Sequence, residues 1–212
     1  MTTDRRVFLL SASASIIGAL TGCAPQAGLS VQSVQTTGTP FNTLRDYSNE
    51  PHDVRVINRA KFDRAFQPML VPSPYTESPG TVVIDTSARQ LYLIEPQGKA
   101  RRYGIAVGDA GYAWSGRARV GRKATWPAWH PTASMHAKSE LPVRVAPGAH
   151  NPLGSRALYL FEGGRDTLYR IHGTSEPWTI GTRASSGCIR MFNEDVIDLY
   201  DRVAVGATVI VK

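Results

Sequence analysis

Short apolar runs alternate with turn residues from residue 81 onwards. Segments 81–85 (TVVID), 91–95 (LYLIE) and 100–108 (ARRYGIAVG) are rich in β-branched and aromatic residues, and turn residues separate them. Segment 157–173 predicts a hairpin whose two strands flank Gly163 and Gly164, and 206–212 (GATVIVK) predicts a last strand. These patterns predict a mainly β domain made largely of antiparallel strands.

One helix is indicated close to the C-terminus. Val196, Leu199 and Val203 recur at helical spacing, and Glu194 suits the positive end of a helix that starts near it. We expect Asn193 to cap this helix. Segment 55–70 offers room for a second, short helix, so the predicted fold class is mainly β with one or two short helices.

The first 22 residues have the pattern of an export signal. Arg5 and Arg6 precede a run of apolar and small residues over 7–20. This run is too short for a transmembrane helix, which needs roughly 20 apolar residues. The paired arginines resemble a twin-arginine signal, and LTGC at 20–23 resembles a lipobox. We therefore expect lipidation at Cys23. The alternative is a signal that ordinary signal peptidase cuts, in which case the cysteine at this position is a coincidence.

A polar segment follows Cys23, and we expect 23–80 to be a linker and N-terminal extension, with the folded domain at 81–212. The chain has a net charge of +7. Removal of 1–22, with two arginines and one aspartate, leaves +6. Such a charge favours anionic surroundings, and export argues against nucleic acid as a partner. The basic residues are scattered, so charge adds little more.

The chain has two cysteines, and a lipidated Cys23 would leave Cys188 unpaired in an oxidising compartment. Such a thiol is either a small buried apolar group or a reactive one. His172 ends the second strand of the predicted hairpin, on the same face as Arg170. A histidine can take the proton of a thiol, and the backbone N–H groups of a glycine-rich turn can stabilise an oxyanion. A metal site is a weak alternative, because the five histidines and Cys188 form no tight ligand pair.

The stretch RIHGTSEPWTIGTRASSGCIRM at 170–191 closely resembles the signature of the L,D-transpeptidase catalytic domain, a family of cysteine peptidoglycan transpeptidases. IDTSARQLYLIE, YGIAVG, WSGRARVGRKATWPAW and NPLGSRALYL extend the resemblance over about 81–212. It implies an L,D-transpeptidase-like β-sandwich or open barrel. It also implies that no cofactor or metal is needed.

The resemblance assigns roles to individual residues. It implies that Cys188 is the nucleophile, that His172 is the general base and acid, and that the Gly173 carbonyl orients the imidazole. The N–H groups of Ser186, Gly187 and Cys188 would form the oxyanion hole. The family commonly has Ser-His-Gly-Cys, whereas this chain has serine at 185 and 186, so a second histidine near the thiol is absent.

Four further residues are candidates for substrate binding: Arg190, Ser185, Trp126 and Trp129. Arg190 could hold a stem carboxylate or form a structural ion pair with Glu194 or Asp195. The two tryptophans lie in a long loop that either lines the substrate groove or packs on the sheet.

The resemblance implies a peptidoglycan L,D-transpeptidase. The enzyme would attack the carbonyl between the third residue of a tetrapeptide stem, a meso-diaminopimelate-type L-centre, and the terminal D-Ala. D-Ala would leave, a thioester would form on the cysteine, and the acyl group would pass to an amine. That amine belongs to another stem, a D-amino acid or a protein lysine, and carbapenem-type inhibitors are expected to acylate the thiol. Alternatives are a hydrolase on the same scaffold and a non-catalytic peptidoglycan-binding lipoprotein. We expect a periplasmic protein, anchored through Cys23 in the inner or outer membrane; Ala24 favours the outer one weakly.

Overall fold

The computed structural model describes residues 38–212 except 110–113, 138 and 186. Residues 1–22, Cys23 and the start of the extension therefore lie outside the described residues. Within the described ranges, no helix is long and apolar enough to cross a bilayer. The described residues form one compact unit.

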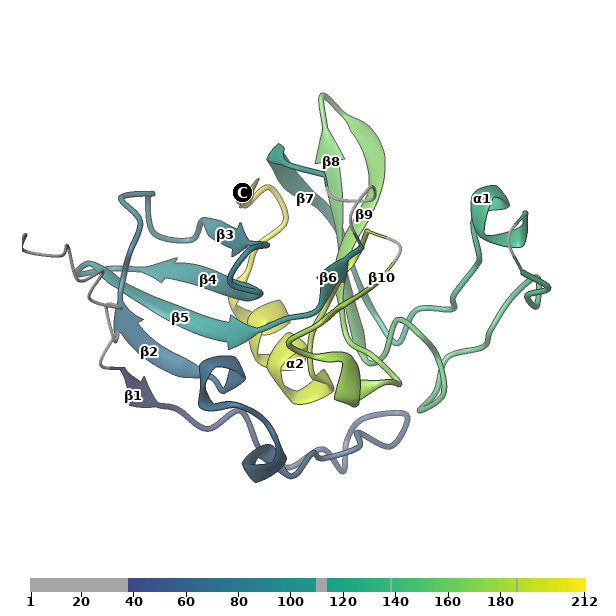
Figure 1. The fold of residues 1–212 in the computed structure, drawn as a ribbon, viewed down its shortest axis with the longest axis horizontal. Helices are drawn as coiled ribbons and strands as arrows, with labels where there is room; N and C mark the ends of the chain where they lie inside the picture. The colour runs from purple at the N-terminus through teal and green to yellow at the C-terminus, as the bar shows by residue number, and fades with distance from the viewer. Residues whose placement is uncertain (1–37, 110–113, 138, 186) are drawn as a thin grey trace, which may run out of the picture. The chain divides into compact units, whose positions relative to one another are not determined.

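Most strands belong to a single large sheet with the order β1-β2-β5-β4-β3-β12-β7-β8-β9-β11 (Figure 1). A second sheet pairs β6 with β10. The strands are β1 (Thr39–Pro40), β2 (Met69–Pro72), β3 (Val82–Asp85), β4 (Gln90–Glu95), β5 (Lys99–Gly104), β6 (Val107–Gly108), β7 (Gly116–Thr125), β8 (Arg156–Glu162), β9 (Arg165–His172), β10 (Arg183–Ser185), β11 (Ile189–Arg190) and β12 (Thr208–Val211).

In the described part of the chain two α-helices accompany the sheets, α1 (Ala133–His136) and α2 (Asn193–Arg202). Three short 3₁₀ helices lie at Arg59–Lys61, Arg64–Phe66 and Pro177–Thr179. The prediction of a mainly β fold with one or two short helices is confirmed. The antiparallel strands predicted over 81–108 include β3, β4 and β5, and the predicted hairpin is present as β8 and β9. The long strand β7, rich in arginine and glycine, was not foreseen.

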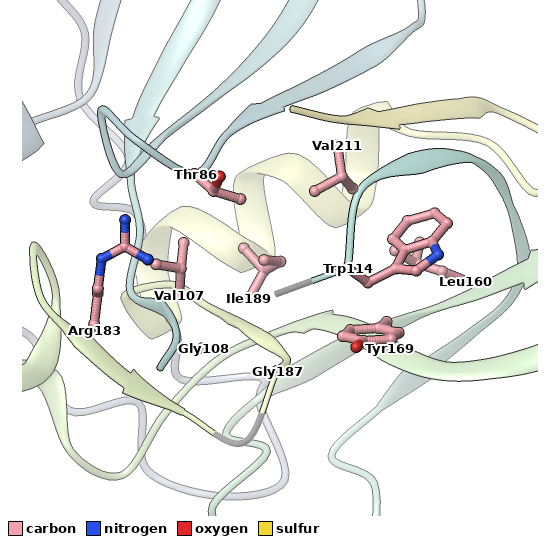
Figure 2. Close-up of a pocket in the computed structure, with 10 residues that line it drawn as sticks. All are labelled: Thr86, Val107, Gly108, Trp114, Leu160, Tyr169, Arg183, Gly187, Ile189 and Val211. Atoms are coloured by element: carbon pink, nitrogen blue, oxygen red, sulfur yellow. The ribbon is translucent and has the colours of Figure 1, made fainter. Parts of the chain in front are cut away.

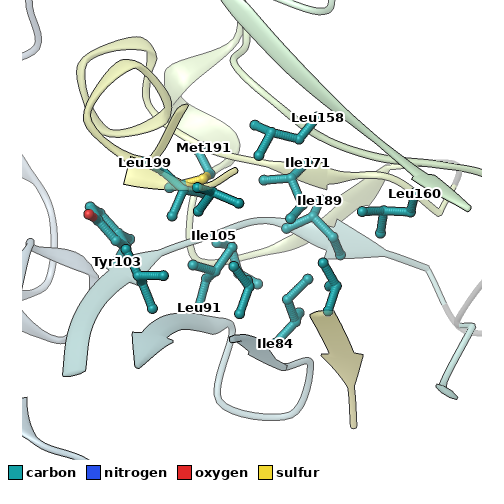
Figure 3. Close-up of a cluster of buried hydrophobic side chains, with 14 of the residues drawn as sticks. Ile84, Leu91, Tyr103, Ile105, Leu158, Leu160, Ile171, Ile189, Met191 and Leu199 are labelled. Carbon is teal, nitrogen blue, oxygen red and sulfur yellow. The ribbon is translucent and has the colours of Figure 1, made fainter. Parts of the chain in front are cut away.

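The main core lies where the apolar faces of these strands meet α2. Figure 3 shows Tyr103 from β5, Leu158 from β8 and Leu199 from α2 converging on this space. Alternate residues of the strands enter the core because side chains alternate between sheet faces. The core fixes β8, β9 and α2 relative to one another, and these elements carry the candidate site.

The residues before β3 pack against the domain. β1 and β2 extend the sheet next to β5, with Val71 opposite Ala100. Arg59 reaches the first turn of α2, where its two terminal nitrogens bind the two carboxylate oxygens of Asp195 at 2.9 and 2.8 Å. Glu194 and Asp195 are fully buried there. Thus the N-terminal extension supplies the cation that faces these two buried carboxylates.

Candidate active site

The parallel pairing of β9 with β11 brings the predicted histidine and cysteine to one place. Arg190 lies opposite His172 and Ile189 opposite Ile171, so Cys188 follows next to Arg170. Ile171 and Ile189 point into the core, so Arg170, His172, Cys188 and the strand neighbour Arg190 occupy the other face. This pairing joins residues that are far apart in sequence.

His172 is buried, with a defined orientation. Its Nδ1 lies 2.6 Å from the carbonyl oxygen of Gly173. A carbonyl only accepts, so Nδ1 carries the proton in this arrangement and Nε2 keeps its lone pair. Burial, and then the charges of Arg190 and Arg170, lower the pKa of His172 to about 3. The imidazole is therefore neutral at pH 7 and able to accept a proton at Nε2.

Asn193 holds the loop that carries this carbonyl. Its Oδ1 accepts from the N–H groups of Ser155 and Thr174 at 3.0 and 3.3 Å, and its Nδ2 donates to the Thr174 carbonyl at 2.9 Å. A Cβ atom on Gly173 would lie 2.1 Å from this Oδ1, so the close packing requires glycine. Asn193 was expected to cap α2, which is wrong: Phe192 occupies the cap position, and Asn193 uses its side chain on the loop instead.

The turn before Cys188 depends on close packing between backbones. Gly187 has a φ of 119°, in the region that favours glycine. A Cβ atom on Gly108 would lie 2.7 Å from the Gly187 Cα atom. Figure 2 shows these two glycines beside a small apolar space of about 10 Å³, next to the stacked rings of Trp114 and Tyr169. The turn therefore packs closely against the apolar interior of the domain.

Ser185 uses its hydroxyl inside this turn. The hydroxyl donates to the Cys188 carbonyl at 2.5 Å and accepts from the Gly187 N–H at 3.2 Å. The side chain is buried, so in this arrangement it stabilises the turn. The Gly187 N–H was expected in the oxyanion hole, and here it donates to the Ser185 hydroxyl. Ser186 lies outside the described residues, and the oxyanion hole stays a prediction.

The thiol of Cys188 is half-buried and faces a groove. Its Sγ lies 3.7 Å from the carbonyl oxygen of Leu168, and the Arg170 guanidinium donates to the same oxygen. Burial raises the pKa of the Cys188 thiol above its ordinary value, and Arg170 opposes the rise through its charge and its hydrogen bonding to sulfur. The resting pair is thus a neutral imidazole and a thiol.

The groove has a volume of about 710 Å³ and is lined by β7, β8, β9, the loop at 127–135 and Cys188. Trp129 lines it, and its backbone pairs with Val145. Trp126 is buried instead: its Nε1 donates to Glu50 at 2.7 Å and its ring meets the edge of His52. The structure therefore favours a packing role for Trp126, whereas Trp129 is placed to contact a ligand.

Arg190 forms an ion pair, but with an unexpected partner. Its Nη1 lies 2.7 Å from a carboxylate oxygen of Glu176. Glu194 and Asp195, the partners considered from sequence, face Arg59 instead, with the nearest Glu194 oxygen at 3.7 Å. Half of the Glu176 side chain is exposed, so a ligand carboxylate has room to compete for Arg190.

The buried imidazole predicts a pH dependence of stability. The pKa of His172 is about 3 in the folded state and 6.5 ordinarily. Below pH 6.5 the unfolded chain binds a proton that the folded chain does not. The stability that neutral His172 provides is therefore lost as pH falls from 6.5 towards 3, by up to about 1.4 kcal/mol per pH unit.

Chemical denaturation of the wild-type chain and His172→Gln between pH 4 and 8 measures this effect, because subtraction removes the other titrating groups. We expect the free-energy difference between the two proteins to be constant above pH 7.5 and to decline below 6.5 in favour of the variant. A difference that stays constant over the whole range would show that His172 does not titrate as described.

The contact between Arg170 and the thiol predicts a change in cysteine reactivity. We expect Arg170→Gln to raise the thiol pKa, because the cation that opposes the effect of burial is removed. One pKa unit lowers the alkylation rate by iodoacetamide about tenfold at pH values below the thiol pKa. Arg165→Gln is the matched control, exposed on the same strand. Superimposable pH–rate curves for the two variants would contradict the assignment.

Comparisons with known proteins agree with this geometry. The family model of YkuD, described as the L,D-transpeptidase catalytic domain, matches residues 79–211. The probable L,D-transpeptidase YbiS of Escherichia coli strain K12 is 36% identical over 154 residues, which cover 68% of this chain and 47% of YbiS. The chain thus spans about half the length of YbiS.

The probable L,D-transpeptidase ErfK/SrfK of the same strain is 30% identical over 237 residues, covering 97% of this chain and 73% of that relative. A solved structure from Brucella melitensis, titled a probable carnitine operon oxidoreductase, is 49% identical, with 71% of this chain and 96% of that chain covered and a TM-score of 0.48. At that TM-score the overlay adds nothing to the assignment. The family match and the two curated relatives establish that this chain belongs to the L,D-transpeptidase catalytic domain family.

Proposed function

We propose that this chain is a peptidoglycan L,D-transpeptidase with Cys188 as its nucleophile. The observation that carries the proposal is the juxtaposition on β9 and β11: a neutral imidazole fixed by the Gly173 carbonyl, beside a thiol that opens into a large groove. Membership of the L,D-transpeptidase catalytic domain family supports the same function.

The proposed reaction begins with attack of the Cys188 sulfur on a carbonyl of a tetrapeptide stem. His172 Nε2 takes the thiol proton as the S–C bond forms, since the thiol is protonated at rest. The carbon–nitrogen bond to D-Ala then breaks, and the imidazolium gives its proton to the leaving amine. A thioester remains on Cys188.

The second half of the reaction reverses these steps. An amine enters, His172 removes its proton, and the amine nitrogen attacks the thioester carbonyl. The carbon–sulfur bond breaks, the new amide leaves, and the imidazolium returns its proton to the sulfur. Burial keeps the imidazole unprotonated at neutral pH at the start of each step. The Asn193 bridge holds the loop that carries the Gly173 carbonyl, and this carbonyl fixes the ring through Nδ1.

Intact-mass spectrometry tests this proposal through the intermediate. The protein is quenched in acid within seconds of mixing with a tetrapeptide stem, and we expect a mass increase equal to the tripeptide acyl group. Peptide mapping should locate it on Cys188, within 170–191. Exposure to a carbapenem should give a stable adduct at the same residue. Absence of any adduct on Cys188, with stem consumed, would refute a thioester route.

We further propose that Cys23 carries a lipid and anchors the protein on the periplasmic side of a membrane. The LTGC pattern at 20–23 and the polar segment after it support this. We expect the protein purified from membranes to contain a diacylglycerol-modified Cys23 as its first residue. Cys23→Ala should shift the protein to the soluble fraction. A wild-type protein that is fully soluble, with no lipid mass, would refute the anchor.

A further inference from the structure

A row of side chains runs across the groove from β7 to the nucleophile. Arg122 pairs with Tyr159, and Tyr159 pairs with Arg170. The register of β9 and β11 places Cys188 next in this row. All four residues line the groove. A ligand bound at Cys188 therefore has two guanidinium groups along one direction of the sheet.

A β-bulge aims Arg122 at the groove. Val120 lies opposite Leu160 and Arg122 opposite Tyr159, which makes Gly121 the extra residue. Without the bulge, Arg122 would share the core-facing side of Val120, which is fully buried. Bulges often re-aim a side chain beside a functional site. The bulge in β7 is therefore the reason that the Arg122 side chain is exposed.

The two arginines are held against one aromatic ring. The Cζ atom of Arg122 lies 3.5 Å from the ring centroid of Tyr159, and that of Arg170 lies 4.8 Å from it. A guanidinium stacked on a ring keeps the N–H donors in its plane available for a carboxylate. At Arg170 one of these donors is already bound to the Leu168 carbonyl. Arg170 also faces Asp166 at 3.6 Å, which neutralises part of its charge. The lining of the groove contains no aspartate or glutamate among the described residues.

We propose that Arg122 and Arg170, stacked on Tyr159, form a carboxylate subsite for the stem peptide. The inference rests on the proposed function, and it names the group recognised: the side-chain carboxylate of a diaminopimelate residue whose L-centre carbonyl is attacked by Cys188.

The dimensions agree with that group. Strands lie about 4.8 Å apart, so Tyr159 is roughly 10 Å from the thiol along the row. The diaminopimelate side chain places its far carboxylate about 7 Å from the reacting carbonyl when extended. An arginine–carboxylate hydrogen bond of about 2.8 Å spans the remainder.

Binding to the full chain carrying Cys188→Ala tests the subsite without turnover. The ligands are a tetrapeptide stem, the same peptide amidated at the diaminopimelate side chain, and the same peptide amidated at the terminal D-Ala. We expect side-chain amidation to weaken binding about tenfold in this protein, and to have less than a twofold effect after Arg122→Gln is added. Arg119→Gln, on the same strand but facing another groove, should retain the tenfold effect.

Kinetics in the active chain provide a second readout. Arg122→Gln should raise KM about tenfold with kcat within about twofold of wild type, and Arg119→Gln should leave both unchanged. Three results would overturn the subsite. Side-chain amidation could still weaken binding about tenfold after Arg122→Gln, or only amidation at the terminal D-Ala could weaken binding. The third is that the unmodified tetrapeptide does not bind at all. A wild-type chain that does not turn over the stem would refute the proposed function. If side-chain amidation still weakened binding to it about tenfold, the subsite would be retained.

Discussion

Turnover of a tetrapeptide stem is expected to fall by at least about 10⁴-fold when Cys188 is replaced by alanine, because no other group in the row can form the thioester. The thiol is half-buried, and its contact with the Leu168 carbonyl is long, at 3.7 Å. The loss of packing is small, so the melting temperature should fall by about 2–4 °C at most.

D-Ala release and thermal melting, measured on the same preparation, separate chemistry from folding. His172→Gln provides a matched comparison, since it keeps the nucleophile and removes the proton acceptor. Release that continues at the wild-type rate in Cys188→Ala would remove Cys188 from the mechanism. A collapsed melting transition would instead show that the thiol is structural.

The largest effect on stability is expected from Arg59→Ala. Asp195 and Glu194 are fully buried, and Arg59 is the cation that faces both. Breaking a buried ion pair by removing one partner costs about 3–5 kcal/mol, because the remaining charge is uncompensated. For a domain of this size the melting temperature should fall by roughly 10 °C. Lys61→Ala, exposed in the same 3₁₀ helix, should have little effect.

The pH dependence of this variant has a defined sign. Burial already raises the pKa of Asp195 and Glu194 in the folded chain, and Arg59 opposes the rise. Without Arg59 the folded pKa values rise further, so the folded variant binds protons more readily than the unfolded chain. The stability deficit should therefore be largest at neutral pH and shrink as pH falls towards the ordinary carboxyl values of 3.8 and 4.5. A deficit that grows at acid pH would contradict the ion-pair account.

Local patterns predicted much of the fold. The hairpin of β8 and β9 follows from apolar runs flanking two glycines, and α2 follows from its helical spacing. The position of His172 at a strand end was visible in the same way. These elements are specified by neighbouring residues, which is why a single sequence reveals them.

The remainder depends on contacts between distant residues. The parallel pairing of β9 with β11 joins two segments separated by a loop, and no local pattern specifies it. The Gly121 bulge and the partner of Arg190 have the same origin. Asn193 was misassigned because a capping residue and a loop-bridging residue look alike before a helix. The stacked arginines were missed because Arg122 and Arg170 come together only across β8.

Amine exchange is the most direct test of acyl transfer from a stem peptide through Cys188. The protein is incubated with a disaccharide-tetrapeptide and D-Met, and the products are identified by mass spectrometry. We expect a product in which D-Met has replaced D-Ala, or cross-linked dimers, and we expect both to be absent with Cys188→Ala. Loss of D-Ala alone would make water the acceptor and the protein a carboxypeptidase. An unchanged tetrapeptide would contradict the account.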